Sequence, residues 1–198
     1  ASRITATTSI GNRGVINIER EVKMSGSIHD KGILILSGYL SENFAQGYPL
    51  SMNASICFEQ SYGGVDGDSA SGAELYAILS SLGGIPIKQN IAATGSINQK
   101  GEIQVVGGIT EKIEGFYYTC KNKGLNGNQG VIIPKNNIRN MILSEEVNNA
   151  IKEGMFHIYT VNNVEEAMEI LTDMKFSEIK ALVKERLDSF AKLRDSSK

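Results

Sequence analysis

The sequence predicts a single domain built from both strands and helices, of the α+β or the mixed α/β class. Short stretches rich in β-branched residues alternate with stretches of helical periodicity along the chain. Glycine is plentiful at 21 residues and proline scarce at 3, which favours many tight turns. With 198 residues, of which 41% are hydrophobic, the chain has the length of one domain and can bury a core without disulfides or metals.

Strands are predicted to dominate the chain up to about residue 60. We expect strands at residues 15–22, 32–36 and 55–59, with a polar turn at 29–32 and a short helix opening at 41–45. Glycine and aspartate then favour a loop at 61–68. A helix follows at 69–82, because Leu75, Ile78, Leu79 and Leu82 recur at helical spacing.

Strands and helices alternate through the rest of the chain. A strand at 87–93, a hairpin turn at 98–101, a return strand at 102–106 and a helix at 110–123 are expected in turn. Beyond them we expect a strand at 131–134, a helix start at 144, a strand at 157–161, and helices at 163–171 and 176–193. The last helix is amphipathic, as is typical of a helix that covers a core.

Charge and cysteine content exclude several classes of protein. The 20 basic and 22 acidic residues give a net charge of −2, which argues against a chain that mainly binds nucleic acid. Cys57 and Cys120 form no CxxC pair, and His29 and His157 form no HExxH motif, so neither disulfides nor a metal centre are expected. This cysteine usage favours a reducing compartment, and we expect a cytoplasmic location. The sequence starts at Ala1, as a fragment or a processed product does.

Ser69 stands at the boundary between the predicted loop and the helix after it, in the run Gly-Asp-Ser-Ala-Ser at 67–71. Backbone N–H groups and the dipole at a helix N-terminus would stabilise an oxyanion formed beside this serine. The same residues suit a plain helix cap, which is the commoner role of Asp and Ser before a helix. A nucleophilic Ser69 therefore requires a base elsewhere in the chain.

Lys112 is the lysine best placed to act as that base. It falls in the first turn of the helix predicted after Gly107 and Gly108, with Phe116 one turn further on. A lysine acts as a base only when its pKa falls from about 10.4 to about 7–8, a change of about 4 kcal/mol that desolvation can supply. The helix dipole would also disfavour the ammonium form. The alternative is an ordinary solvated lysine, as most lysines are.

Taken together, the run at 67–71 and the run Gly-Gly-Ile-Thr-Glu-Lys at 107–112 resemble the proteolytic domain of Lon proteases. Ser69 and Lys112 stand at the separation that this family shows. Residues 59–62 and Asp68 are similar to the archaeal, B-type branch, because the other branch has proline in place of Asp68. The resemblance continues through residues 93–97, 101–108 and 131–134, and it covers roughly residues 14–172.

The resemblance implies a role for four residues of this chain. Ser69 matches the nucleophile of the family and Lys112 its general base. Thr94 matches a threonine that hydrogen-bonds the lysine. Asp66 matches an acidic position that pairs with the lysine in some members, which would raise the pKa of the lysine and make that state inactive. Ser71 does not match the family's spacing and is not expected to be the nucleophile.

The resemblance also implies an α+β fold, with a single proteolytic domain over residues 1–198, a core at about 14–172 and a C-terminal helix at 173–198. The expected function is that of a serine endopeptidase acting on unfolded or damaged proteins. Members of the family carry an ATPase domain and assemble as hexamers, and the parent protein can be anchored at the cytoplasmic face of a membrane. These 198 residues contain no GxxxxGK[ST] motif, so ATP and Mg²⁺ would belong to that other domain, with no cofactor or nucleic acid expected here. The alternative is a catalytically silent or latent domain that serves ring assembly or partner binding.

Overall fold

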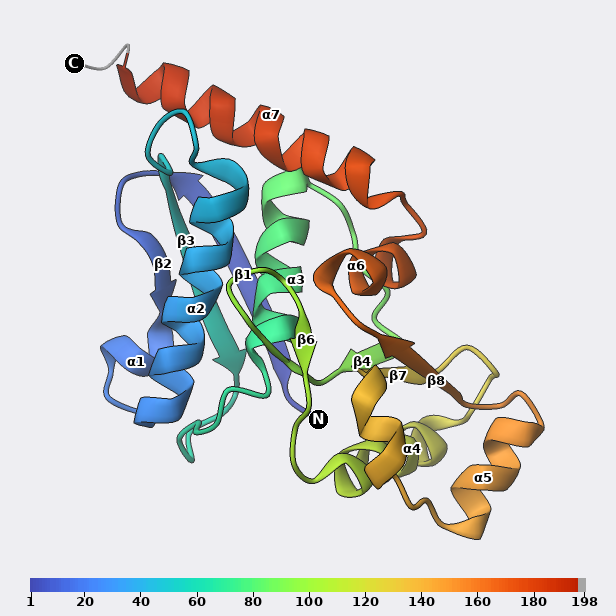
Figure 1. Cartoon of the computed structure of the whole chain (residues 1–198). Coiled ribbons are helices and arrows are strands. Elements are labelled where there is room, and N and C mark those ends of the chain that lie inside the picture. Colours follow the sequence, from blue (N-terminus) through green and yellow to red (C-terminus); the bar gives the residue numbers. More distant parts are fainter. Residues whose placement is uncertain (196–198) are drawn as a thin grey trace.

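The computed structural model describes residues 1–195 and contains both sheets and helices (Figure 1). Its strands are β1 (Arg3–Ile10), β2 (Gly14–Asn17), β3 (Met52–Glu59), β4 (Ile91–Ala93), β5 (Ser96–Ile97), β6 (Ile103–Gln104), β7 (Gly130–Pro134) and β8 (His157–Val161). Its helices are α1 (Ile18–Glu21), α2 (Ser27–Phe44), α3 (Ser71–Gly83), α4 (Ile109–Lys123), α5 (Glu145–Lys152), α6 (Val164–Thr172) and α7 (Phe176–Asp195), with a 3-10 helix η1 (Lys135–Asn140). The expected α+β class is therefore confirmed, in a single compact domain.

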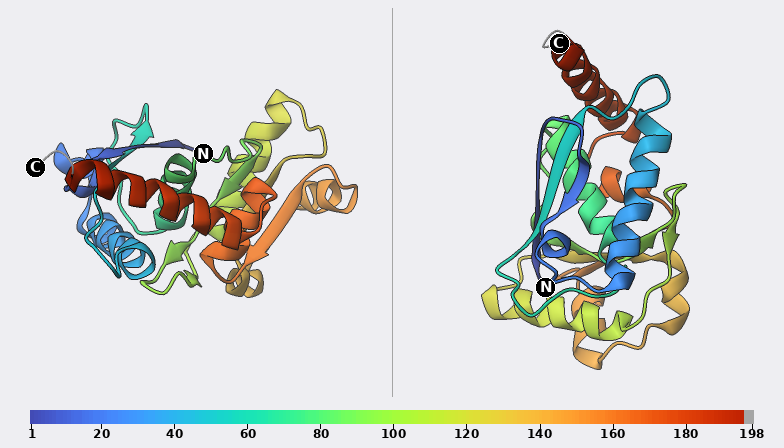
Figure 2. Two further views of the ribbon diagram at one scale, coloured as in Figure 1. Left: turned by 90° about the horizontal axis from the view of Figure 1, so that it is seen from above. Right: turned by 90° about the vertical axis from the view of Figure 1, so that its left-hand side faces the viewer.

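The first sheet has the strand order β1-β3-β2 and supplies one wall of the larger core. β1 runs antiparallel to β3, and β2 runs parallel to it. Alternate residues of β3 are buried, namely Met52, Ala54, Ile56 and Phe58, because successive side chains of a strand point to opposite faces. Helix α3 packs against β1 and α7, and α7 lies at the end of the molecule opposite α4 and α5 (Figures 1 and 2).

The second sheet is parallel, with β7 between β4 and β8, and it separates two hydrophobic cores. Every residue of β7 is buried. Ile132 faces the first core, which contains residues of α2, α3, β3, α6 and α7. Val131 and Ile133 face the second core, which contains residues of α4, α5 and Phe156. The period of two along β7 thus places neighbouring residues in different cores.

The predicted strand at 32–36 and the predicted turn at 29–32 are wrong, because both segments lie inside α2. The apolar run at 33–36 is too short to distinguish a strand from a helix by itself. Over a longer window His29, Ile33, Leu36 and Leu40 are buried at helical spacing, whereas Leu34 is 59% exposed. The helical period of the buried face therefore decides the structure of this segment.

The predicted strand at 15–22 is correct only in its first half. β2 ends at Asn17, whose side chain accepts a hydrogen bond from Arg20 N and so caps the short helix α1. β1 has no counterpart among the predicted strands. The predicted loop at 61–68, the helix at 69–82 and the elements from 110 onward agree with the structure to within two residues at most ends.

No helix among residues 1–195 combines the length and apolar character needed to cross a membrane.

Candidate active site

Ser69 lies in the turn that directly precedes α3, and it is partly exposed to solvent. The chain reaches this turn through Gly67, whose φ of +84° is a left-handed value that favours glycine. The Asp66 carboxylate accepts a hydrogen bond of 2.8 Å from Gly67 N, and Ser71 N donates to Asp68 O at 3.0 Å. These local bonds form the turn that presents the Ser69 hydroxyl in front of the helix.

The carbonyl oxygen of Ser69 is held from the opposite side by the segment after β4. Gly95 N donates to Ser69 O at 2.9 Å, and the Thr94 hydroxyl donates to the same oxygen at 3.4 Å. Gly72 N in turn donates to Gly95 O at 3.1 Å. A Cβ on Gly72 would lie 2.9 Å from that oxygen, so this close approach of two backbone segments requires glycine at position 72.

Lys112 lies in the first turn of α4, the helix whose buried face belongs to the second core. Gly108 precedes this helix with a φ of +66°, and Lys112 N donates to Gly108 O at 3.0 Å. The side chain reaches across to the turn before α3, where its Nζ lies 3.0 Å from Ser69 Oγ. The structure therefore brings together the two residues that the sequence singled out, from elements in different cores.

Two effects of opposite sign act on the protonation of Lys112. Although the residue as a whole is exposed, partial burial of its amine lowers the pKa of Lys112, and the negative charge of Asp68 opposes this effect. Burial is the larger of the two causes. A neutral amine that is 3.0 Å from a hydroxyl can accept its proton.

Three other residues that the sequence brought forward have contacts of their own. Asp66 is exposed and lies against Gly26, and within residues 1–195 it forms no ion pair with Lys112. The Thr94 hydroxyl donates to the Ser69 carbonyl at 3.4 Å. Ser71 is 1% exposed, and its Oγ accepts a hydrogen bond from Ile97 N, so it is unavailable to a substrate.

Comparison with known proteins identifies the family. Residues 55–173 match the family model of the Lon protease (S16) C-terminal proteolytic domain. The chain belongs to the Lon protease family. The matched residues contain Asp66, Ser69, Thr94 and Lys112, so the whole candidate site lies inside the Lon proteolytic domain.

Relatives of this Lon domain occur in bacteria and archaea. It is 44% identical over 173 residues to a protein of Escherichia coli (strain K12) and 45% identical over 170 residues to one of Haemophilus influenzae, each named "Putative Lon protease homolog". It is also 39% identical over 126 residues to the Archaeal Lon protease of Archaeoglobus fulgidus, a match that covers 63% of this chain and 18% of that protein. The two bacterial matches cover 87% and 86% of this chain but only 30% and 28% of the relatives, so the chain spans under a third of their length.

Sequence reasoning on the Lon motifs missed one residue that affects the site, Asp68. It served only as a marker of the archaeal branch, yet its charge acts directly on Lys112. Its position next to Ser69 is the signal that could have identified it, because a carboxylate adjacent to the nucleophile must be close to a base that reaches the same hydroxyl. Within the described part of the chain no group of three or more His, Cys, Asp or Glu side chains is placed to hold a metal ion.

Proposed function

We propose that this domain is a serine endopeptidase in which Ser69 is the nucleophile and neutral Lys112 is the general base. The observation that carries the proposal is the 3.0 Å separation of Lys112 Nζ and Ser69 Oγ, together with the burial that lowers the pKa of the lysine. Membership of the Lon proteolytic family supports the same reaction class.

The proposed reaction proceeds by acyl transfer. Ser69 Oγ attacks the carbonyl carbon of the scissile peptide bond while its proton moves to Lys112 Nζ. The C–N bond then breaks, Lys112 returns the proton to the leaving amine, and an ester on Ser69 remains. Water, deprotonated by the neutral lysine, hydrolyses this ester and regenerates the Ser69 hydroxyl. The dipole at the start of α3 would stabilise the oxyanion, because the positive end of the helix lies beside Ser69.

Thr94 and Asp66 have supporting roles in this proposal. By donating its proton to the Ser69 carbonyl, the Thr94 hydroxyl keeps its oxygen lone pairs available to accept a hydrogen bond from Lys112. Thr94 would thereby orient the lysine, as the family resemblance implies. Asp66 would regulate the site only after a rearrangement of its loop, because its carboxylate is bonded to Gly67 N here.

The parent protein would be an ATP-dependent Lon protease that degrades unfolded or damaged proteins in the cytoplasm. The relatives support this because they are more than three times as long as the matched segment. The additional length would include an ATPase domain that uses ATP and Mg²⁺, and six copies would form a ring. The parent could be anchored at the cytoplasmic face of a membrane. The domain described here would need no cofactor of its own and would not bind nucleic acid.

The test is cleavage of an unfolded model protein by the wild-type chain, by Ser69→Ala and by Ser81→Ala. Ser81 lies near the far end of α3, where its hydroxyl is bonded to that of Thr8, and serves as the matched control. We expect cleavage by the wild type and the control and none by Ser69→Ala. Cleavage that survives Ser69→Ala would mean another nucleophile. A wild-type chain that neither cleaves nor reacts covalently at Ser69 with a fluorophosphonate would favour the silent or latent alternative.

A further inference from the structure

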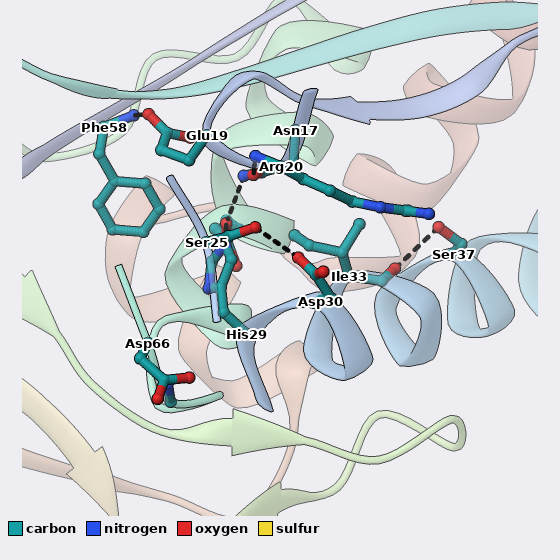
Figure 3. A network of polar contacts seen from close by, with 12 residues as sticks. Asn17, Glu19, Arg20, Ser25, His29, Asp30, Ile33, Ser37, Phe58 and Asp66 are labelled. Carbon is teal, nitrogen blue, oxygen red and sulfur yellow. Dashed lines mark hydrogen bonds and ion pairs between the residues drawn. The ribbon is translucent and has the colours of Figure 1, made fainter. Parts of the chain in front are cut away.

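Three ionisable side chains that the proposed reaction does not use are buried together behind the Ser69 turn. They are Glu19 of α1, His29 of α2 and Glu74 of α3, with exposed fractions of 4%, 1% and 1%. Figure 3 shows Glu19, His29 and Asn17 in the same polar region, with Phe58 next to Glu19. We call these three side chains the buried cluster. Burying three ionisable groups in one place is costly unless they contact one another.

The contacts within the buried cluster meet at the Glu74 carboxyl. His29 Nε2 lies 3.5 Å from Glu74 Oε1, and Asn17 Nδ2 donates to the same oxygen at 3.4 Å. Glu19 Oε1 accepts a hydrogen bond of 2.8 Å from Phe58 N. In the described part of the chain, Glu19 Oε2 and His29 Nε2 have no hydrogen-bond partner. The cluster is thus a set of near contacts rather than a fully bonded network.

The charges around Glu74 favour its protonated form at neutral pH. Burial, and secondly the negative charge of Glu19, raise the pKa of Glu74 to about 8. The other polar groups that face the two carboxyls are the His29 imidazole and the Asn17 amide at Glu74, and the Cys57 thiol of β3 at Glu19. Above about pH 8 the cluster would hold two carboxylates in a buried space, and they would repel each other.

Two of the three helices that carry the buried cluster, α2 and α3, contact the Ser69 turn directly. Glu74 is in the first turn of α3, where its N–H donates to Ala70 O at 2.9 Å. His29 is in the first turn of α2, and Gly32 in the next turn packs against Asp68, with a Cβ position 3.3 Å from Asp68 Cβ.

The segment before α2 is bonded to the loop that leads to Ser69. Gly26 N donates to Val65 O and Val65 N donates to Met24 O, each at 2.8 Å. A displacement of α2 relative to α3 would therefore move residues 65–70 as well.

We propose that His29 and Glu74 are positioning residues of the peptidase reaction, whose buried contact fixes the first turn of α2 against that of α3 and so holds Ser69 within reach of Lys112. The inference rests on the proposed function. This contact is stable only while Glu74 is neutral. When Glu74 ionises, its charge repels that of Glu19, and the first turns of α2 and α3 move apart. Neither His29 nor Glu74 touches the substrate.

The test compares Glu74→Met and Glu74→Gln with Val183→Ala. Met removes the polar contacts with little change of shape, whereas Gln reproduces the neutral carboxyl. Val183 is the matched control, since it is buried and its Cγ2 lies 3.6 Å from the Cβ position of Gly83, at the other end of α3. At pH 7 we expect kcat of Glu74→Met to fall at least about ten-fold with KM within about two-fold, because small displacements of a nucleophile have large effects on rate. Glu74→Gln and Val183→Ala should stay within about three-fold of the wild type.

The pH profile provides a second readout that a purely structural role would not change. As the pH increases through about 8, the kcat of the wild type should fall relative to that of Glu74→Gln, because Lys112 becomes neutral in both chains whereas only the wild type acquires a second buried carboxylate. If Glu74→Met does not fold, the comparison of the wild-type and Glu74→Gln pH profiles tests the proposal by itself. A Glu74→Gln profile that falls like that of the wild type, or a Glu74→Met chain as active as Val183→Ala, would overturn the proposal.

Hydrogen exchange separates a failure of this inference from a failure of the proposed function. The Gly95 amide, which donates to Ser69 O, reports on the position of the turn without any cleavage. Should the wild-type chain prove inactive, faster exchange of this amide in Glu74→Met than in Val183→Ala would still support the positioning role. Equal exchange in the two variants would refute it.

Discussion

The two hydrophobic cores differ in size and in how they treat their polar residues. The first, larger core holds the nucleophile turn through α3, and it buries Glu19, His29 and Glu74 with two polar atoms unpartnered among the described residues. The second core holds Lys112 through α4 and buries Asn137, whose side-chain oxygen and nitrogen each have a hydrogen-bond partner. Asn137 Oδ1 accepts from Val106 N at 3.0 Å, and its Nδ2 donates to Val106 O at 2.9 Å.

This difference indicates how each residue of the proposed dyad is positioned. The bonds of Asn137 fix Val106, which directly precedes the turn into α4, so the base has a rigid origin. The Ser69 turn has direct hydrogen bonds from Gly95 and Thr94, but α2 and α3 next to it meet at near contacts that, on the proposed positioning role, change with protonation. We therefore expect the distance between Ser69 and Lys112 to change more easily through movement of the Ser69 turn than through movement of α4.

The largest effect is expected for Lys112→Met. Removing a general base should lower kcat/KM by about 10²–10⁴-fold. The exposed position of the side chain should leave the free energy of unfolding within about 0.5 kcal/mol of the wild type. Steady-state cleavage and urea unfolding measure the two quantities, and Lys123→Met at the other end of α4 is the control. A variant that keeps wild-type kcat/KM would show that Lys112 is not the base.

Next in size are the effects of Ile132→Ala and Ile133→Ala, neighbours on β7 that face different cores. Each should cost about 2–5 kcal/mol of unfolding free energy, as is usual when a buried isoleucine is truncated. Hydrogen exchange should then become faster in α3 for Ile132→Ala and faster in α4 for Ile133→Ala. The same exchange pattern in both variants would show that the cores open as one unit.

Asp68→Asn should shift the pH dependence of cleavage. The Asp68 charge raises the pKa of Lys112, so its removal lowers that pKa further and leaves more of the lysine neutral at a given pH. The acid side of the profile of kcat/KM should therefore move to lower pH, with Glu111→Gln on the exposed face of α4 as the control. Movement to higher pH would contradict the direction of this electrostatic effect.

Thr94→Val should have the smallest effect of the four. It removes the hydroxyl that donates to Ser69 O while keeping the shape of the side chain. The loss of one hydrogen bond should cost about 0.5–1.5 kcal/mol of unfolding free energy. A several-fold decrease in kcat should accompany it, measured in the same cleavage assay. An unchanged kcat would mean that the Gly95 amide alone is sufficient to hold the Ser69 carbonyl.

Sequence alone predicted the elements around the site better than the elements that support it. The sequence predicted α3, which follows Ser69, and α4, which carries Lys112. Glycine turns and helical spacing mark the starts of both helices. α2 was missed, since its apolar run at 33–36 looks like a strand in a short window. The buried cluster could not be predicted, because it joins three segments that only the tertiary structure brings together.

The contacts of individual site residues were also beyond the sequence. The motif suggested that Thr94 and Asp66 act on the lysine, but the structure directs the Thr94 hydroxyl to the Ser69 carbonyl and the Asp66 carboxylate to Gly67 N. Spacing along a chain determines which residues share a loop. The direction of a hydroxyl or a carboxylate depends on which backbone groups the folded chain brings within hydrogen-bonding distance, here the Ser69 carbonyl and the Gly67 amide.

The central place of β7 has a consequence for the synthesis of the chain. Ser69 leaves the ribosome well before β7, and the second core is complete only when Phe156 has joined it. Until then α4 has no complete core to pack on, and the serine has no base. If Ser69 and Lys112 act as proposed, a newly made chain would be unable to cleave its neighbours, and proteolytic activity would be acquired only when folding is nearly finished.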